Sequence, residues 1–286
     1  MLPFRKILFP VDYSTPCKAI VPYVKEMVRH FDAQLTLVHA YGPEALAYVQ
    51  LPMTAPELPE ETHVHETQRL REFAQEIFPG QHVELFAQLG EAGAIVDHVV
   101  QHQGADLVML ATHGRGPVRR FLLGSVAAKV LHDLSTAVWT GTGAALTEHA
   151  PQLPYKSVLC ALDDSEEAEA VLRASADFAA AYRAKLWLVH VVETPPPTLE
   201  VDFTPYKTEI MDAADVRLRE LKAEMGIDAP HSIIDATIAD GLSQAAVLRK
   251  ADLIVTGRGH AQGTFGRMWS TLYPIVRQSP CPVLSI

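Results

Sequence analysis

Short apolar runs of strand length alternate along the first half of the chain with longer stretches in which apolar residues recur at helical spacing. The apolar runs are rich in Val, Ile and Leu, and they fall at 6–11, 34–39, 82–88, 106–111 and 136–139. Nearly continuous apolar character is typical of parallel strands that are buried on both faces. The alternation of five such strands with helices predicts an open parallel sheet with helices on both faces and right-handed crossovers.

The stretches between these runs predict helices at 15–30, 56–78, 91–102 and 125–133. Thr15 followed by Pro16 predicts the first helix start, with Thr15 as the N-cap and Pro16 at the first helical position. Gly124 and Ser125 stand at the start of the last helix, where the Ser125 hydroxyl is a candidate N-cap.

The whole pattern occurs twice. Residues 6–14 match 157–165, and 35–40 match 186–191, at one constant separation. Later blocks match at a slightly shorter separation, 105–108 with 251–254 and 136–139 with 281–284. A motif order that is kept over both halves predicts a duplicated domain. We expect domain 1 at 1–142, a Gly- and Pro-containing linker at 143–155, and domain 2 at 156–286.

Composition narrows the class of protein. The 286 residues carry 24 Lys and Arg against 34 Asp and Glu, a net charge of −10, which disfavours a nucleic-acid-binding surface. Three cysteines without a Cys-x-x-Cys pair disfavour a disulfide framework or a cysteine zinc site. No signal-peptide pattern and no bilayer-spanning apolar run are found, so we expect a cytoplasmic protein without membrane contact.

Two segments follow predicted strands with residues that suit a ligand. Pro10, Val11 and Asp12 follow the first strand, and a carboxylate there can accept hydrogen bonds from a ribose or hold a cation; the alternative is a turn residue. After the fourth strand comes a loop from Ala111 to Ser125 that contains Gly114, Arg115 and Gly124. Free N–H groups at the following helix start favour an anion such as a phosphate.

The spacing from Gly114 to Gly124-Ser125, with Pro10-Val11-Asp12 and Val38-His39, resembles the universal stress protein family in two tandem copies. The resemblance implies a Rossmann-like α/β fold that binds ATP or a related adenine nucleotide. It places one set of residues around the adenosine, namely Val11, Asp12 and Ala40. It places a second set around the phosphates, namely Gly114, Gly124, Ser125 and Val126. Pro10, Ala111 and Arg115 adjoin these sets.

The sequence departs from the family pattern most in domain 2. In domain 1 Ala111 stands at the first glycine of the motif. Its methyl group limits how closely the backbone can approach a ligand, but it does not abolish the loop. In domain 2 Thr256 stands at the first glycine position, Gly259 at the second, and Trp269 at the third, before Ser270 and Thr271. Asp163 and Val191 still match the adenosine positions. We therefore expect a degenerate second site and a nucleotide site mainly in domain 1.

The implied function is a nucleotide-binding regulatory or stress-tolerance protein. The alternatives are a weak ATPase, with Asp12 helping to hold Mg²⁺, and a nucleotide-free interaction scaffold. Support for the ATPase is weak, because no general base or other catalytic residue stands out. The resemblance also implies that segments 136–140 and 281–286 pair in an internal pseudo-dimer, with a homodimer as a further alternative. His98 and His102 share a helical face without a third ligand nearby, and no metal site is assigned. His39 is expected to be a packed core residue.

Overall fold

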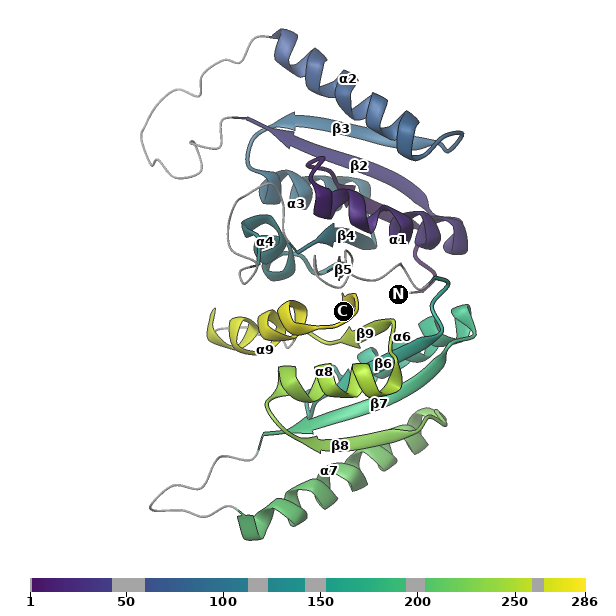
Figure 1. Ribbon diagram of the computed structural model, residues 1–286, viewed down its shortest axis with the longest axis vertical. Coiled ribbons are helices and arrows are strands. Elements are labelled where there is room, and N and C mark those ends of the chain that lie inside the picture. Colours follow the sequence, from purple (N-terminus) through teal and green to yellow (C-terminus); the bar gives the residue numbers. More distant parts are fainter. Residues whose placement is uncertain (1, 43–59, 113–122, 142–152, 194–203, 259–264) are drawn as a thin grey trace. The chain divides into compact units, whose positions relative to one another are not determined.

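The computed structural model describes residues 2–42, 60–112, 123–141, 153–193, 204–258 and 265–286 (Figure 1). The chain divides into two compact units, Pro3–Trp139 and Thr140–Ile286, and the division falls within one strand. Each unit is described by itself below as domain 1 and domain 2. Among the described residues, no helix is long and apolar enough to cross a membrane.

Domain 1 has the predicted sheet. Its strands are β1 (Lys6–Pro10), β2 (Gln34–Tyr41), β3 (Val83–Leu89), β4 (Leu107–Ala111) and β5 (Ala137–Gly141), in the order β3-β2-β1-β4-β5. The pairs β1–β2, β1–β4 and β2–β3 are parallel. The expected α/β fold class is confirmed. The order reverses at β1, which lies between β2 and β4, and this position is where ligands bind in open α/β sheets.

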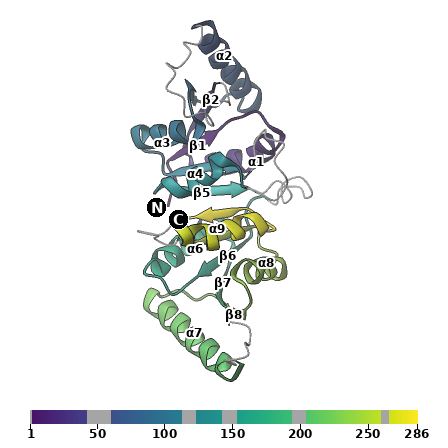
Figure 2. The same cartoon turned by 90° about the vertical axis from the view of Figure 1, so that its left-hand side faces the viewer.

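The helices of domain 1 are α1 (Thr15–Phe31), α2 (Glu60–Ile77), α3 (Ala92–Gln103) and α4 (Ser125–Asp133). Helix α2 packs on β2 and β3, whereas α3 packs on β2 and α4. Figure 2 shows α1 and α3 on opposite sides of the sheet. The core between these layers is built from fully buried apolar side chains, among them Phe9, Leu37, Met27 and Trp139.

The start of α1 differs from the prediction by one residue. Ser14, not Thr15, is the N-cap, and its Oγ accepts a hydrogen bond of 3.2 Å from the amide of Cys17. Thr15 and Pro16 are therefore the first two helical residues. Pro16 has no amide hydrogen and is tolerated at the first or the second helical position. The proline alone therefore does not identify the N-cap residue.

Domain 2 repeats the architecture. Its strands are β6 (Ser157–Leu162), β7 (Lys185–Val192), β8 (His231–Asp235), β9 (Leu253–Thr256) and β10 (Val283–Ser285), in the order β10-β9-β6-β7-β8. Its helices are α6 (Ala168–Tyr182), α7 (Thr204–Met225), α8 (Ile238–Arg249) and α9 (Phe265–Gln278). The described pairs of this sheet are parallel as well.

One aspartate in each domain joins the beginnings of two neighbouring strands. Asp106, just before β4, accepts hydrogen bonds from the amides of Arg5 (2.7 Å) and Lys6 (3.1 Å). Asp252, just before β9, accepts from the amides of Lys156 (2.7 Å) and Ser157 (3.1 Å). The repeated Ala-Asp-Leu motif therefore has the same structural role in both domains.

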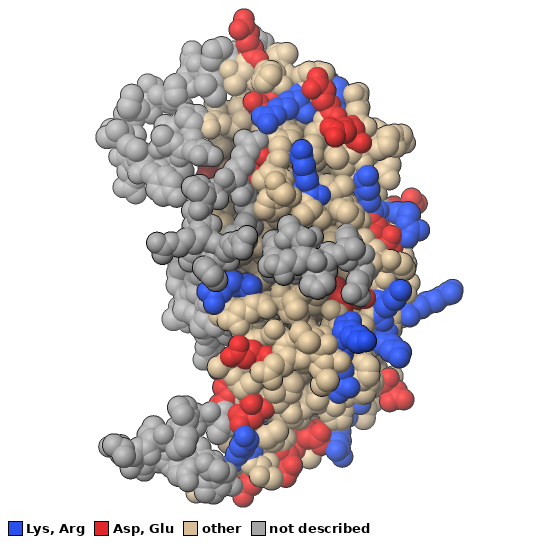
Figure 3. Space-filling model, in the orientation of Figure 1, with Lys and Arg blue, Asp and Glu red and all other residues tan. Residues whose placement is uncertain are grey.

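The surface carries charges of both signs. On the face drawn in Figure 3, the acidic and basic side chains of the described residues are interspersed over both domains. Mixed charge of this kind favours solubility and does not by itself mark a binding surface.

Candidate functional site

The carboxyl ends of β1, β2 and β4 bring several of the predicted nucleotide-site residues to one edge of the domain 1 sheet. Pro10 and Ala111 are the last residues of β1 and β4, and Ala40 lies next to the end of β2. Val11 is buried, and its amide donates a hydrogen bond of 2.7 Å to the carbonyl oxygen of Val38. This bond continues the β1–β2 ladder past β1 and fixes the direction in which the chain leaves the sheet.

Asp12 forms a tight turn with Ser14. Oδ1 of Asp12 accepts hydrogen bonds from the amide (3.0 Å) and the Oγ (2.6 Å) of Ser14, while Ser14 caps α1. Asp163 and Ser165 make the same two contacts in domain 2, at 3.1 and 2.5 Å. The turn role that the sequence offered for Asp12 is thus present in both domains. A hydrogen bond to a ribose would add to this role.

The two residues that flank the loop after β4, Thr112 and Gly124, are joined by a hydrogen bond. Gly114 and Arg115 lie outside the described residues, as do all of 113–122. On either side of that segment, the amide of Gly124 donates a hydrogen bond of 2.8 Å to the carbonyl oxygen of Thr112, which is fully buried. The start of α4 is therefore held directly at the carboxyl end of β4, next to β1.

Helix α4 begins without a side-chain cap. Its N-cap is Gly124, which makes no side-chain hydrogen bond, and Ser125 is the first helical residue rather than the cap that the sequence suggested. By contrast, Ser14, Glu91 and Thr237 cap α1, α3 and α8 with their side chains. Because glycine has no side chain to accept from the first amides, the amides of Ser125 and Val126 suit an external anion.

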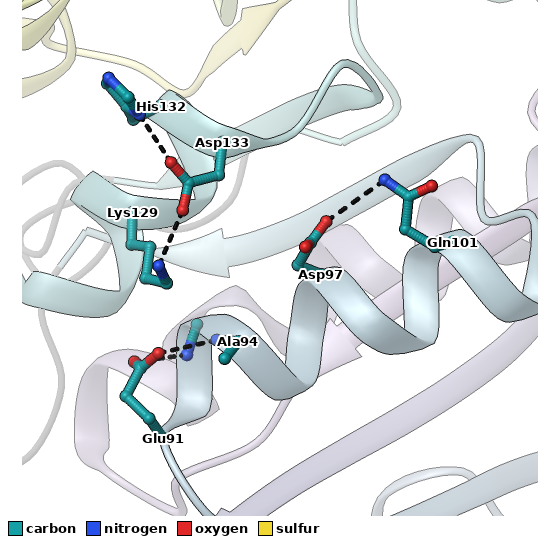
Figure 4. A network of polar contacts seen from close by, with 8 residues as sticks. Glu91, Ala94, Asp97, Gln101, Lys129, His132 and Asp133 are labelled. Carbon is teal, nitrogen blue, oxygen red and sulfur yellow. Dashed lines mark hydrogen bonds and ion pairs between the residues drawn. The ribbon is translucent and has the colours of Figure 1, made fainter. Parts of the chain in front are cut away.

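Helices α3 and α4 pack on each other, and each carries polar contacts among its own side chains (Figure 4). Lys129 on α4 forms an ion pair with Asp133 at 2.8 Å, and Asp133 also contacts His132 at 2.6 Å. These partners raise the pKa of Lys129 and lower the pKa of Asp133. The stem of Lys129 crosses Gly93 of α3 so closely that a Cβ there would lie 2.5 Å from its Cδ. The glycine thus allows the close approach of the two helices.

The corresponding helix of domain 2 begins earlier relative to the motif. Helix α9 starts at Phe265, so Ser270 and Thr271 lie beyond its first turn, and their amides are not among those left free at a helix start. Gly259 lies outside the described residues, and so does the Trp269 side chain. Asp163 is exposed at the end of β6, and Val191 lies in β7. The two domains therefore differ in the backbone where the phosphates are expected.

Sequence reasoning missed a cluster of polar and aromatic side chains at the same edge of domain 1. His39 is buried, as expected, but it contacts Glu66 of α2, while Arg69 of α2 covers the ring of Tyr13 at 4.2 Å. Tyr41 donates or accepts a hydrogen bond of 2.6 Å with His63, and its pKa is raised by burial and by the charge of Glu66. Only the Val-His motif signalled this cluster, because its other members come from separate elements.

The histidines do not assemble a metal centre in the part of the chain that the structure describes, where no three His, Cys, Asp or Glu side chains converge as ligands. His98 and His102 on α3 stack with their ring centroids 3.9 Å apart, and Nδ1 of His102 lies 2.8 Å from the carbonyl oxygen of His98. This pair is explained by helical spacing alone.

Comparison with known proteins defines the class. A model of the universal stress protein family matches residues 3–140 and again 154–286. The chain therefore belongs to the universal stress protein family, as a tandem of two copies.

Individual relatives agree. A universal stress protein of Thermus aquaticus is 31% identical over 137 residues, which are 46% of this chain and 98% of the relative. The universal stress protein Sll1654 of Synechocystis is 30% identical over 139 residues, 46% of this chain and 85% of the relative. The crystal structure of a universal stress protein from Archaeoglobus fulgidus superposes with a TM-score of 0.71 at 20% identity, over 98% of this chain and 95% of that one. At this identity the structural likeness concerns the fold.

Proposed function

We propose that this tandem universal stress protein binds an adenine nucleotide in domain 1, and that the bound state regulates its role in stress tolerance. The observation that carries the proposal is the hydrogen bond from Gly124 to Thr112, which brings the uncapped start of α4 to the carboxyl end of β4. That position adjoins the strand-order reversal at β1, where ligands of open α/β sheets bind.

The proposed roles follow from this placement. The amides of Ser125 and Val126 and the Ser125 hydroxyl face the phosphates, with Gly114 and Arg115 in the adjoining loop. Val11, Asp12 and Ala40 border the adenosine. The methyl group of Ala111, at the end of β4, lies where the family motif has a glycine. ATP is the nucleotide that we propose, and Mg²⁺ would accompany its phosphates.

Binding without turnover is the form of this function that the geometry supports best. Oδ1 of Asp12 already accepts two hydrogen bonds from Ser14, in a turn that domain 2 repeats. A carboxylate engaged in this way is better suited to orient a ligand than to activate water. We therefore place the protein among nucleotide-responsive regulators of the cytoplasm.

A substitution at Gly124 tests the proposal. In Gly124→Asp the new carboxylate caps the free amides of α4 and places a negative charge where a phosphate would lie. We expect ATP affinity, measured by isothermal titration calorimetry on the full chain, to fall at least about tenfold. The melting temperature should stay equal or rise, because Asp is a favourable N-cap.

Thr237→Asp is the matched control. Thr237 is the N-cap of α8 in domain 2, with extended backbone angles like those of Gly124, and its side chain already serves as a cap. This variant should bind ATP like the wild type. ATP binding that survives unchanged in Gly124→Asp would place the phosphates elsewhere and contradict the proposal.

We also propose, on the sequence argument alone, that segments 136–140 and 281–286 pair the two domains edge to edge. Domains that share such an interface should unfold together. Differential scanning calorimetry should then show one transition, and light scattering a particle of 31.4 kDa. Two independent transitions would contradict the pairing, and twice the mass would indicate a homodimer.

A further inference from the structure

The imidazole of His39 lies between a carbonyl oxygen, with which it forms a hydrogen bond, and a carboxylate oxygen at ion-pair distance. The residue is 4% exposed, its Nδ1 lies 2.7 Å from the carbonyl oxygen of Val11, and its Nε2 lies 3.3 Å from Oε2 of Glu66. A carbonyl oxygen only accepts hydrogen bonds, and an ionised carboxylate also only accepts. With Glu66 ionised, both nitrogens therefore face their partners favourably only when both carry a proton, that is, as the imidazolium.

The groups around His39 connect it to α2. Arg69 lies 3.5 Å from the same Oε2 of Glu66, and its guanidinium covers the ring of Tyr13, whose centroid is 4.7 Å from that of His39. On its own strand, His39 stacks on Tyr41 at 6.3 Å, and Tyr41 contacts His63 of α2. Among the described residues, the charged and titratable groups around the ring include Glu66, Tyr13 and Tyr41, with Arg69 and His63 behind them.

The contacts of His39 lead directly to the Asp12 turn. Val11 and Tyr13 flank Asp12, and both contact the ring of His39. Tyr13 has a φ of 62°, a left-handed conformation that is unfavourable for a residue other than glycine. The packing of Tyr13 against His39, Arg69 and Phe73 holds it there. A change in the charge of His39 therefore acts on both neighbours of Asp12.

We propose that His39 is a positioning residue whose doubly protonated ring fixes α2 and the Val11–Tyr13 segment, so that nucleotide binding by domain 1 weakens as the pH rises. Loss of the Nε2 proton turns a donor facing Glu66 into an acceptor facing a carboxylate, and the contact becomes repulsive. This inference rests on the proposed function, because it assigns a regulator to the same site.

Domain 2 provides an internal comparison. At the position equivalent to Tyr13 it has Asp164, which forms an ion pair of 2.9 Å with Arg217 of α7. The equivalent histidine, His190, is partly exposed in β7. An aspartate–arginine pair keeps its charges throughout the neutral range. The attachment of α7 to the turn after β6 is therefore expected not to change between pH 6 and 8.5, in contrast to that of α2.

Glu66→Gln isolates the titration. A glutamine amide can accept from a protonated Nε2 or donate to an unprotonated one, so the contact persists at either pH. Between about pH 6 and 8.5, we expect wild-type affinity for ATP to fall at least about fivefold more than that of Glu66→Gln. The phosphate of ATP itself titrates near pH 6, and it does so equally in the experiments with wild type and with Glu66→Gln. A difference between the two pH profiles therefore arises from the protein. Glu76→Gln, an exposed change on the same helix, should keep the wild-type profile.

A measurement without nucleotide separates this inference from the proposed function. The imidazole ¹⁵N signals of His39 in the full chain should show two protonated nitrogens at pH 6 and one at high pH, and amide exchange in α2, corrected for intrinsic rates, should speed up with that change. Absence of ATP binding at every pH would overturn the proposed function and its coupling to His39. The ¹⁵N signals of His39 and the amide exchange rates in α2 would still test whether the ring holds α2. A neutral ring at pH 6, or equal pH profiles for wild type and Glu66→Gln, would overturn the role of His39.

Discussion

The amide of Gly124 donates a hydrogen bond of 2.8 Å to the carbonyl oxygen of Thr112, across the loop that follows β4. The bond sets the start of α4 at the carboxyl end of β4, and the N-cap there is a glycine that offers no side-chain acceptor to the first amides of α4. The glycine-rich spacing of the sequence thus has a definite structural consequence, a helix start placed at the strand-order reversal.

The two serines of the repeated motif should differ in their importance. Ser125 is the first residue of α4, whereas Ser270 lies beyond the first turn of α9. We expect Ser125→Ala to weaken ATP binding about three- to tenfold, because a hydroxyl bound to a charged phosphate is lost. Ser270→Ala should leave the affinity unchanged. Calorimetric titration of both variants checks this, and equal losses would indicate two working sites.

The repeated aspartates should be important for stability. Asp252→Ala removes the acceptor of the Lys156 and Ser157 amides, and Asp252 is 8% exposed. We expect a loss of about 2–3 kcal/mol in the free energy of unfolding, and a smaller loss for the more exposed Asp106→Ala. Urea denaturation measures both. The exposed Asp177→Ala on α6 is the control, and a similar cost there would show that charge, not the backbone contacts, is responsible.

The three cysteines should be unreactive in the native protein. Cys17, Cys160 and Cys281 are all buried, and burial raises the pKa of each thiol to about 12. Since the thiolate is the reactive form, labelling by a disulfide reagent at pH 8 should require opening of the fold. The labelling rate should rise with urea in step with unfolding. Rapid labelling of any thiol without urea would show that its environment opens locally.

The same thiols should make the fold less stable in alkali. Their pKa is about 9 when exposed and about 12 when folded, so above pH 9 the unfolded chain releases protons that the native chain retains. Stability present below pH 9 is then lost as the pH rises, at up to about 1.4 kcal/mol per pH unit for each thiol. Urea denaturation between pH 8 and 10.5 measures the slope. Cys160→Ala should flatten it, and an unchanged slope would exclude this cause.

The sequence by itself determined the elements, their duplication and the turn chemistry. Buried parallel strands need continuous apolar runs, so β1 to β5 were found to within about two residues, and α4 at its observed bounds. Asp12 precedes Ser14 by two residues. At this spacing an aspartate carboxylate can accept a hydrogen bond from the backbone amide of the second residue. Such features depend on neighbours along the chain, and a pattern of residues reports them directly.

Only the tertiary structure decided how these elements meet. Glu66 and Arg69 of α2 reach His39 and Tyr13 because α2 packs over β2, a contact between elements that are far apart in the sequence. The start of α9 is a second case. The sequence marks the second site as degenerate by Trp269 at the third glycine position, and the structure adds that the helix itself begins earlier, at Phe265. Glycine at the equivalent Gly124 disfavours helix by about 1 kcal/mol, whereas tryptophan allows the helix to extend through this position.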